Sequence, residues 1–221
     1  MTAAAGNVVW QAPAVTRQQR EHRNGHHGAL VWLTGLPGSG KSTIAHAVEA
    51  RLHHAGWQTV VLDGDNLRHG LCADLGFSLA DRNENVRRAG EVARVFLELG
   101  MVVLVALVSP VRSARDSVRK FFPESDFLEV YCRCALPVCK ERDPKGMYAK
   151  AESGAIPEFT GISSPYEAPL AAELILDTDQ EGAEQSVQRL STFLLDRMGA
   201  TDNGECGVSA QHRRQRQMLG W

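Results

Sequence analysis

The strongest chemical signal in the sequence is a glycine-rich segment, residues 35–42, that matches the pattern G-x-x-x-x-G-K-S/T. Glycines let such a loop curl so that successive backbone N–H groups point at phosphate oxygens, and a following helix adds the positive end of its dipole. The spacing predicts that Lys41 reaches the β- and γ-phosphates of a nucleotide and that the Ser42 hydroxyl binds Mg²⁺. Because the segment follows a predicted strand and opens a predicted helix, we interpret it as a P-loop.

An acidic motif, residues 62–68, narrows the chemistry because it comes directly after a second predicted strand. Asp63 ends that strand within plausible reach of Mg²⁺ and of an acceptor hydroxyl. In the commoner P-loop arrangement an acid ends another strand of the core, but here the central strand runs into Ser109. The metal-orienting or base role is therefore expected at Asp63, with Asp65 as the alternative. A simple turn is the competing interpretation, since Asp, Gly and Asn favour turns.

A basic cluster beside an aromatic residue is the third candidate. Arg82, Asn85 and Arg88 are spaced three residues apart, so they are expected to project from roughly one face of a helix. Two guanidinium groups beside Phe77 suit an anionic nucleotide whose base stacks on an aromatic ring. A solvated, charged helix face is the competing interpretation.

Residues 143–169 form a long segment that is rich in Gly and Pro and has no sustained hydrophobic period. The segment contains Lys145, Tyr148 and Phe159, and such a mixture of basic and aromatic side chains is what a closing lid requires. Its charge would bind phosphates, and its bulk would exclude the water that competes with an acceptor hydroxyl. Disorder is the alternative, although a strand predicted over residues 174–176 argues against it.

Alternating strand-like and helix-like segments must position these groups. Short apolar runs predict strands over residues 30–34, 58–62, 102–108, 127–132 and 174–176. Helices are predicted over residues 43–54, 84–99, 111–120, 137–142 and 183–198. The alternation predicts an α/β fold, a parallel sheet flanked by helices on both faces. Ligands of such sheets bind beyond the carboxyl ends of the strands, so the motifs are expected at one edge.

Three parts are expected along the chain. Residues 1–28 read as a polar N-terminal arm, either solvated or forming a short surface helix. Residues 29–199 are predicted to be a P-loop kinase domain that includes the lid, residues 143–169. Residues 200–221 are polar, with a basic patch, and are expected to be a mobile tail.

Composition and charge exclude several classes of function. The formal net charge of −2 gives no bulk attraction to nucleic acid or to a membrane surface. The longest apolar run, residues 101–108, is far shorter than the roughly 20 residues that a membrane span needs. The first residues lack the apolar core of a secretory signal, so a soluble, cytoplasmic protein is expected.

Two groups of potential metal ligands are weak candidates. Cys132, Cys134 and Cys139 have a spacing that fits zinc sites poorly, and buried, reduced thiols suit a cytoplasmic protein. His26 and His27 are adjacent, but neighbouring imidazoles in a polar stretch are more often exposed. Neither group therefore predicts a metal centre.

Considered in order, the motifs resemble those of the adenylylsulfate kinase family of P-loop kinases. The matching segments are residues 7–10, 24–26, 32–42, 62–66, 75–78, 82–88, 109–110, 142–148, 159–162 and 165–167. Several segments matched in the same order are more specific than any one of them. The resemblance implies transfer of the γ-phosphoryl group of MgATP to the ribose 3′-hydroxyl of adenosine 5′-phosphosulfate.

The resemblance also implies roles for individual residues. ATP would be held by Gly35, Leu36, Pro37, Gly38, Ser39, Gly40, Lys41, Ser42, Thr43 and Arg142. The acceptor pocket would consist of Asp65, Asn66, Arg68, Phe77, Arg82, Asn85, Val108 and Ser109, closed by Lys145 and Phe159. Catalytic roles would belong to Lys41, Asp63 and Ser109, and Mg²⁺ would bind at Ser42 and Asp63. Some members are said to phosphorylate the position of Ser109, but direct in-line transfer needs no such intermediate.

Family members are usually homodimers, so a homodimer is expected, with functional coupling to a separate ATP sulfurylase. The sequence departs from the family at two positions. Pro37 stands where a small residue such as serine is more usual, and Val108 stands where isoleucine is common. The fixed φ of proline is tolerable in a turn, so neither departure changes the expected activity.

Two other functions compete with this reading. A P-loop kinase for a nucleoside, gluconate or shikimate would share the P-loop, but Phe77, Arg82 and Asn85 favour a nucleotide-like anion. A regulatory module that had lost turnover would keep the fold, but the expected chemical groups, including Lys41 and Asp63, are intact. An enzyme is therefore favoured.

Overall fold

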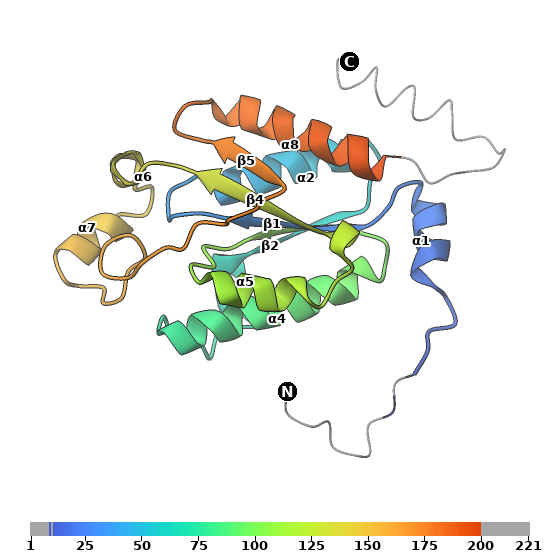
Figure 1. Ribbon diagram of the computed structural model, residues 1–221, viewed down its shortest axis with the longest axis horizontal. Coiled ribbons are helices and arrows are strands. Elements are labelled where there is room, and N and C mark those ends of the chain that lie inside the picture. The colour runs from blue at the N-terminus through green and yellow to red at the C-terminus, as the bar shows by residue number, and fades with distance from the viewer. Residues whose placement is uncertain (1–8, 10, 200–221) are drawn as a thin grey trace.

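The computed structural model describes residue 9 and residues 11–199 of the 221-residue chain. Its centre is a five-stranded sheet in which every neighbouring pair of strands is parallel. In spatial order the strands are β2 (Thr59–Asp63), β3 (Val102–Ala106), β1 (Ala29–Thr34), β4 (Phe127–Arg133) and β5 (Leu174–Asp177). The predicted parallel α/β architecture is confirmed, and all the predicted strands are present (Figure 1).

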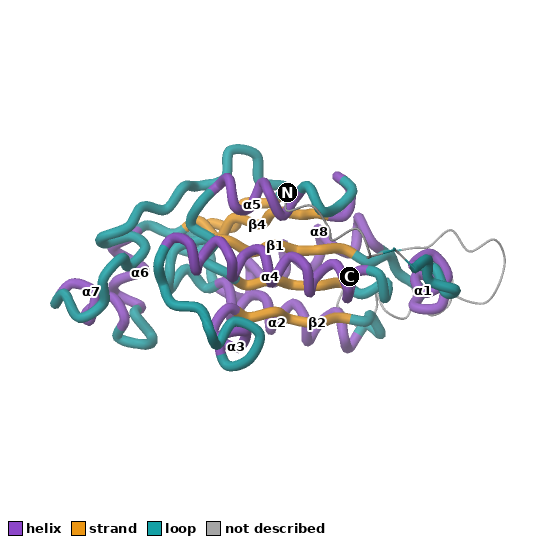
Figure 2. The backbone as a smooth tube through the Cα atoms, turned by 90° about the horizontal axis from the view of Figure 1, so that it is seen from below, coloured by secondary structure: helices purple, strands orange, loops and turns teal. Residues whose placement is uncertain are grey.

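Helices cover both faces of the sheet (Figure 1, Figure 2). On one face lie α2 (Lys41–His54) and α8 (Ala183–Met198), and on the other lie α4 (Leu79–Leu97) and α5 (Arg112–Arg119). The other helices that the structure describes are α1 (Arg17–Asn24), α3 (Gly64–Arg68), the short 3₁₀ helix η1 (Glu124–Asp126), α6 (Leu136–Arg142) and α7 (Met147–Glu152).

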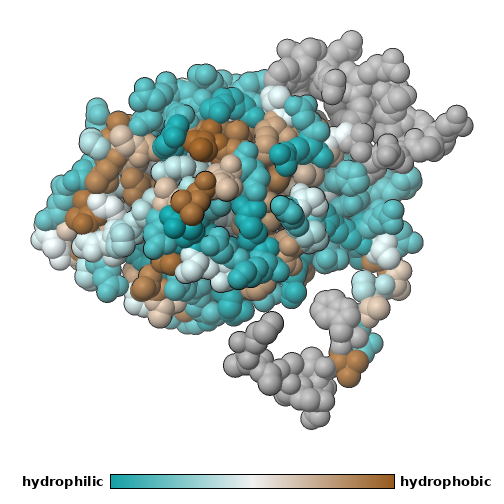
Figure 3. All heavy atoms as spheres, in the orientation of Figure 1, coloured by the Kyte–Doolittle hydropathy of each residue, from teal (hydrophilic) through white to brown (hydrophobic). Residues whose placement is uncertain are grey.

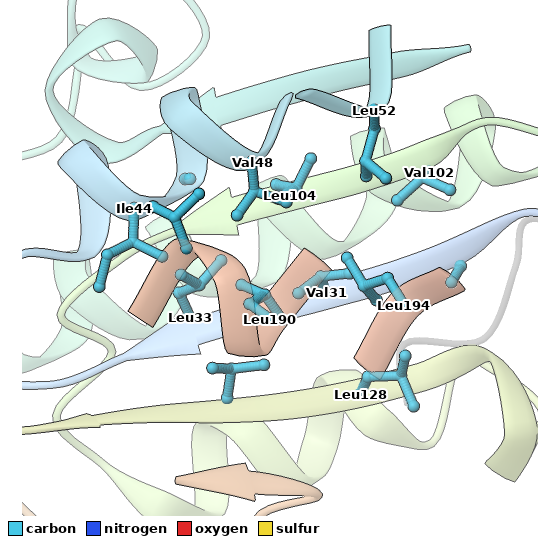
Figure 4. Packing of buried hydrophobic residues seen from close by; sticks show 14 of the residues in the cluster. Val31, Leu33, Ile44, Val48, Leu52, Val102, Leu104, Leu128, Leu190 and Leu194 are labelled. Carbon is cyan, nitrogen blue, oxygen red and sulfur yellow. The ribbon is translucent and has the colours of Figure 1, made fainter. Parts of the chain in front are cut away.

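Because helices cover both faces of the sheet, side chains on both sides of a strand are buried, and the strand sequences are continuous apolar runs. Successive side chains of a strand point to opposite faces, so Val31 and Leu33 of β1 join the core under α2 and α8. Leu30 and Trp32 of the same strand join the core under α4 and α5. Figure 4 shows the first of these cores, with Leu190 of α8 packed between the labelled strand residues. The sheet is thus a rigid frame for the loops at its ends.

Several element boundaries differ from the predicted ones, and the two larger differences near the site concern α4 and β3. α4 begins at Leu79 rather than at residue 84, because the Ser78 side chain caps the helix by accepting the Asp81 N–H at 3.2 Å. β3 ends at Ala106 rather than at residue 108, and Ser109 just beyond it has a φ of 39°. Such a φ is unusual for a residue other than glycine and is incompatible with an extended strand.

The arm contains a helix that packs at the amino-terminal edge of the sheet (Figure 1). α1 begins with a capping box between Thr16 and Gln19 and ends at Gly25, which has a φ of 74°. Arg17 of this helix forms an ion pair with Asp126 of η1. Of the two interpretations left open for this part of the arm, the short helix is the one found.

The expectation that His26 is exposed is wrong. Its side chain is fully buried and stacks on Trp57 with 4.9 Å between the ring centroids. The Nδ1 atom lies 3.0 Å from the His27 carbonyl oxygen, and Nε2 accepts a hydrogen bond from the Gln58 N–H. This arrangement requires a neutral imidazole with its proton on Nδ1. The ring therefore has a structural role, because it packs against the residues just before β2.

The cysteines that the structure describes are buried and free: Cys72, Cys132, Cys134 and Cys139. For Cys132, this agrees with its place in an apolar, strand-like run. Among the described residues, no group of three or more His, Cys, Asp or Glu side chains is arranged to hold a metal ion. Cys206 and the expected tail, residues 200–221, lie outside the described residues.

The surface seen in Figure 3 is mostly hydrophilic, with apolar residues gathered in separate patches. Among residues 11–199, no helix has both the length and the apolar character that crossing a membrane demands.

Candidate active site

A cleft of about 1350 Å³ opens at the carboxyl ends of the strands. Its walls are the P-loop, the loops that follow β2 and β3, and part of the expected lid. The predicted site residues that line it are Pro37, Gly38, Gly40, Lys41, Ser42, Thr43, Asp63, Asp65, Arg68, Phe77, Arg82, Asn85, Val108, Ser109, Arg142, Lys145 and Phe159. The fold therefore brings together side chains from distant segments of the sequence.

The P-loop begins with a tight turn that suits its sequence. The Ser39 N–H donates to the Leu36 carbonyl oxygen at 3.1 Å, and Gly38 has a φ of 75°. This is the pattern of a type II turn, in which proline is favoured at the second position and glycine at the third. Pro37 occupies that second position, so the departure from the usual family residue is accommodated without strain.

Lys41 opens α2 and is buried beneath the P-loop. Its Nζ donates to the carbonyl oxygens of Gly35 at 3.0 Å and Leu36 at 2.8 Å. Burial lowers the pKa of this ammonium group to about 8, because the charged form is removed from water. A bound phosphate would stabilise the charge more strongly than neutral carbonyls do. The ammonium is thus placed to exchange loop carbonyls for a phosphate.

Asp63 is the last residue of β2 and the N-cap of α3. Its Oδ1 accepts a hydrogen bond from the Asp65 N–H at 2.9 Å, which fixes the orientation of the carboxylate. No other hydrogen bond to this carboxylate forms among the described residues, so Oδ2 is available to a ligand. Ser42, in the first turn of α2, lines the same cleft. A carboxylate and a hydroxyl oxygen are ligands of the kind that Mg²⁺ prefers.

The basic side chains elsewhere in the cleft already bind groups of the protein. Arg82 donates to the Phe77 carbonyl oxygen at 2.7 Å. It also donates to Thr160 Oγ1 at 2.6 Å and to the Glu158 carbonyl oxygen, both in the expected lid. Burial, with a smaller contribution from the charge of Arg68, lowers the pKa of Arg82. This arginine therefore joins α4 to the lid.

Arg68 and Lys145 are engaged in the same way. Arg68 donates to carbonyl oxygens of residues 75–76 at 3.1 and 2.8 Å, and its guanidinium carbon lies 4.3 Å from the centre of the Phe77 ring. Lys145 forms an ion pair with Asp65, and the hydrogen bond raises the pKa of the lysine. An anionic ligand in this part of the cleft has to exchange with these internal partners.

Asn85 is the clearest sign of a missing hydrogen-bond partner. It lines the cleft and is only 4% exposed, and among the described residues its Nδ2 makes no hydrogen bond to an oxygen or nitrogen atom, with only the weakly accepting Cys72 thiol beside it. Leaving a buried donor unpaired costs about 1–3 kcal/mol. A ligand that offers an acceptor oxygen or nitrogen to Nδ2 would remove that cost.

Arg88 does not join Arg82 and Asn85, contrary to the prediction of a shared face. Its side chain binds Asp74 and Glu84 and does not line the cleft. A step of three residues falls short of one helical turn, so two such steps rotate Arg88 by roughly 120° from Arg82. The charged-face interpretation is therefore correct for this one residue.

The Ser109 hydroxyl is buried within a hydrogen-bond network. Its Oγ accepts the Trp32 Nε1–H at 3.1 Å and donates to Thr34 Oγ1 at 3.0 Å. The Ser109 carbonyl oxygen accepts a hydrogen bond from Arg115 at 2.7 Å. A non-glycine residue with positive φ costs about 1–3 kcal/mol, and contacts of this kind hold it in place. The residue therefore shapes the wall of the cleft through its backbone.

The expected lid contains a helix, α7, that was not among the predicted elements. α7 follows a turn in which the Asp143 carboxylate accepts three successive backbone N–H groups at distances of 2.8 to 3.2 Å. These bonds satisfy donors at the start of the helix and lower the pKa of Asp143 against the opposing effect of burial. The helix has only six residues, too few for a readable hydrophobic period.

Comparison with known proteins decides the family. The family model described as adenylylsulphate kinase matches residues 27–177. The chain belongs to the adenylylsulfate kinase family. An adenylyl-sulfate kinase of Acaryochloris marina is 54% identical over 197 residues, which are 89% of this chain and 96% of that protein. One of Geotalea uraniireducens is 53% identical over 188 residues, or 85% of this chain and 90% of that protein.

Solved structures of adenylylsulfate kinases have the same fold. The Mycobacterium tuberculosis APS kinase, in complex with AMPPNP and APS, aligns with a TM-score of 0.72 and 48% identity. The alignment covers 77% of this chain and 98% of that one. The resemblance inferred from the motifs is confirmed, and the chain is a kinase of an ATP-using family.

Some of the residues expected from the adenylylsulfate kinase motifs do not line the cleft. Gly35 and Ser39 are buried residues of the P-loop itself. Leu36 packs against a cluster of buried residues that includes Tyr148 and Phe159 of the expected lid. Asn66 is exposed on α3 and lies outside the cleft lining.

Residues after β5 also line the cleft, although no motif in the sequence pointed to them. The cleft is also lined by Thr178, Glu181, Gly182, Ala183 and Ser186, around the start of α8. Arg142 reaches this region, because it donates to the Thr178 carbonyl oxygen. The signal was present in the sequence: the rule that places ligands beyond the carboxyl ends of strands applies to the last predicted strand as well.

Proposed function

We propose that this protein transfers the γ-phosphoryl group of MgATP to the ribose 3′-hydroxyl of adenosine 5′-phosphosulfate. The products are 3′-phosphoadenosine 5′-phosphosulfate and ADP. The observation that carries the proposal is the cleft, which is lined by the P-loop lysine, Asp63, three arginines and the buried Asn85 amide. The names of the curated relatives support the same reaction.

The donor nucleotide is held by the P-loop. Backbone N–H groups and Lys41 bind the β- and γ-phosphates, and Arg142 with the start of α8 lies where the rest of the nucleotide fits. Ser42 and Asp63 would hold Mg²⁺, since both line the cleft and offer oxygen ligands. When bound there, the ion would neutralise charge on the phosphate oxygens.

The acceptor is held by Arg82, Arg68 and Asn85. The two guanidinium groups bind the phosphosulfate, and the Asn85 amide donates to the nucleotide. The base stacks on Phe77, and Phe159 closes over it from the lid. Asp65, Val108 and Lys145, which line the cleft, complete this part of the proposal. The family resemblance also implies Asn66, which lies on α3 outside the cleft lining.

Transfer is direct. The ribose O3′ forms a bond to the γ-phosphorus while the bond from that phosphorus to the oxygen bridging to the β-phosphate breaks. Asp63 orients the 3′-hydroxyl and accepts its proton, which then passes to solvent. Ser109 is assigned a positioning role, because its buried hydroxyl is already bound to Trp32 and Thr34. Residues 143–169 act as the lid that excludes water.

The remaining assignments follow from the family and the composition. The protein acts in the cytoplasm as a homodimer, and a separate ATP sulfurylase supplies its acceptor. Residues 1–28 are the arm, residues 29–199 the kinase domain, and residues 200–221 a tail. Sedimentation analysis of the purified protein tests the dimer: a single species of monomer mass would contradict it.

The deciding experiment is ADP release from MgATP with and without adenosine 5′-phosphosulfate. Release should require the acceptor and yield a 3′-phosphorylated product. The variant Lys41→Ala should lower the rate about 10²–10³-fold, because it removes a donor to the charge that develops in the transition state. A folded, ATP-binding protein with no acceptor-dependent release would contradict the proposal. A screen of nucleoside, gluconate and shikimate acceptors would then separate another kinase from a regulatory module.

A further inference from the structure

The expected lid and the P-loop share a small hydrophobic core, separate from those on the two faces of the sheet. Its buried members are Cys134, Cys139, Tyr148, Ala151 and Phe159. Leu36 of the P-loop packs against them. The P-loop backbone also closely approaches α6, the helix that precedes the lid, since a Cβ added at Gly38 would lie 3.0 Å from the Cys139 carbonyl oxygen. The lid is therefore packed directly on the loop that binds donor phosphates.

Tyr148 forms the most direct link in this core. Its side chain is 2% exposed, and its hydroxyl donates to the Pro37 carbonyl oxygen at 2.9 Å. Its ring meets the ring of Phe159 edge to face, with 5.0 Å between centroids and an angle of 79°. Burial raises the pKa of the hydroxyl, so it stays a protonated donor. One side chain thus contacts the donor loop and the aromatic residue that closes over the acceptor.

On the donor side, the link continues to the P-loop lysine. The carbonyl group that precedes Pro37, that of Leu36, accepts a hydrogen bond from Lys41 Nζ at 2.8 Å. A phosphate that binds Lys41 competes with this carbonyl. Nucleotide binding therefore changes the hydrogen bonding of the peptide next to the one that Tyr148 holds.

On the acceptor side, the link continues to Arg82. The two residues that flank Phe159 are Glu158 and Thr160, and both accept hydrogen bonds from Arg82. Glu158 has a φ of 54°, so this short segment is held in a conformation that depends on its contacts. An anion that binds Arg82 competes with these contacts, which lie beside the ring that Tyr148 packs against.

We propose that Tyr148 is a positioning residue that couples the donor and acceptor sites. Its hydroxyl sets the lid against the P-loop, and its ring holds Phe159 over the acceptor. The inference rests on the proposed function, because it takes ATP and adenosine 5′-phosphosulfate as the two ligands. Occupation of the P-loop favours the lid position that binds the acceptor. Coupling of this kind is reciprocal, so each ligand raises the affinity for the other by the same factor.

The test measures that coupling factor. Calorimetry gives the Kd of adenosine 5′-phosphosulfate with and without a saturating non-hydrolysable ATP analogue and Mg²⁺, for the wild type and for Tyr148→Phe. The variant keeps the ring, so the affinity for each ligand alone should change little. The coupling factor should fall about three- to tenfold, which is the size of effect that one neutral hydrogen bond supplies.

Tyr131→Phe is the matched control. It removes the same hydroxyl group from a tyrosine of β4 that does not line the cleft. Its coupling factor should equal that of the wild type. Thermal unfolding of both variants is measured alongside, because a purely structural role for Tyr148 lowers the Tm without a selective effect on the coupling factor.

The outcomes separate this inference from the proposed function. A selective loss of coupling in Tyr148→Phe supports it. An unchanged factor in that variant, equal losses in the two variants, or a factor of one in the wild type overturns it and leaves the proposed function intact. Failure of the wild type to bind adenosine 5′-phosphosulfate under any condition contradicts the proposed function, and this inference with it.

Discussion

The proposed donor and acceptor halves of the cleft are built in different ways. The phosphate-binding part of the donor half comes from one contiguous segment, residues 35–43, whose lysine is buried and whose glycines allow a tight turn. The acceptor half collects Arg68, Arg82 and Lys145 from segments far apart, and these side chains are half-buried or exposed. Local chain geometry is enough for a phosphate cradle, whereas the acceptor half depends on how the elements pack.

The two halves also differ in what their cations bind. Lys41 is held by carbonyl oxygens of its own loop. Arg82 is held by the lid, and Lys145 of the lid is held by Asp65 at the edge of the sheet. Donor binding therefore exchanges partners within one loop, whereas acceptor binding exchanges contacts that join two parts of the fold. We expect substitutions in the donor half to affect turnover and those in the acceptor half to affect acceptor affinity.

Asp63 is proposed to act on both the metal ion and the acceptor hydroxyl, so its substitution should have the largest effect. Asp63→Asn keeps the shape and removes the charge and the basic oxygen, and kcat should fall about 10²–10⁴-fold. Steady-state kinetics with both substrates measures the change. Asp65→Asn is the matched control, since the sequence alone left Asp65 as the alternative. A larger loss in Asp65→Asn would transfer the role to that residue.

Arg82→Ala should separate the halves most clearly. Removing a charged donor should raise the acceptor KM about 10–100-fold, because hydrogen bonds to charged groups contribute about 1.5–3 kcal/mol. The KM for ATP should stay within about twofold. Thr160→Val removes one lid contact of Arg82 and keeps the guanidinium, so its acceptor KM should not rise. An unchanged acceptor KM in Arg82→Ala would remove this residue from the pocket.

The lowered pKa of Lys41 predicts that the affinity for ATP depends on pH. Burial lowers the pKa of its ammonium group to about 8 in the free protein, while bound phosphate favours the charged form. At pH values above this lowered pKa, the binding of ATP is therefore accompanied by the uptake of a proton. ATP affinity should be highest below pH 8 and fall roughly tenfold between about pH 7.5 and about pH 9.5.

Calorimetric titration of ATP at each pH checks this dependence. Lys41→Met should bind ATP more weakly and show no decline over the same range, because it has no ammonium group to titrate. A decline of equal size in the variant would assign the effect to another group.

Lys145→Met should have the smallest effect. The ion pair between Lys145 and Asp65 is largely exposed, so its loss should change the Tm by no more than about 2 °C. The acceptor KM should rise about threefold, because only a screened charge is removed. Thermal unfolding and kinetics measured on the same preparation check both values. A large fall in the Tm would show that the ion pair holds the lid in place.

The elements of the fold were largely predictable because of their pattern. Buried strands such as β1 read as short apolar runs, and α8 was predicted with both of its ends. α3 and α7 were missed because helices of five and six residues carry no period, and their starts depend on the carboxylates of Asp63 and Asp143. His26 was misplaced because its burial comes from stacking on Trp57, which is distant in the sequence.

The residue order was sufficient to establish the fold class, the P-loop with Lys41 and the family. These depend on local conformation and on spacing, which a sequence displays directly. Only the tertiary structure decided which side chains line the cleft. Arg88 points elsewhere and binds Asp74, whereas Thr178 and residues near it line the cleft. The tertiary structure also decided that Tyr148 touches both the P-loop and Phe159. Contacts between distant segments depend on packing, and packing leaves no periodic trace in the order of residues.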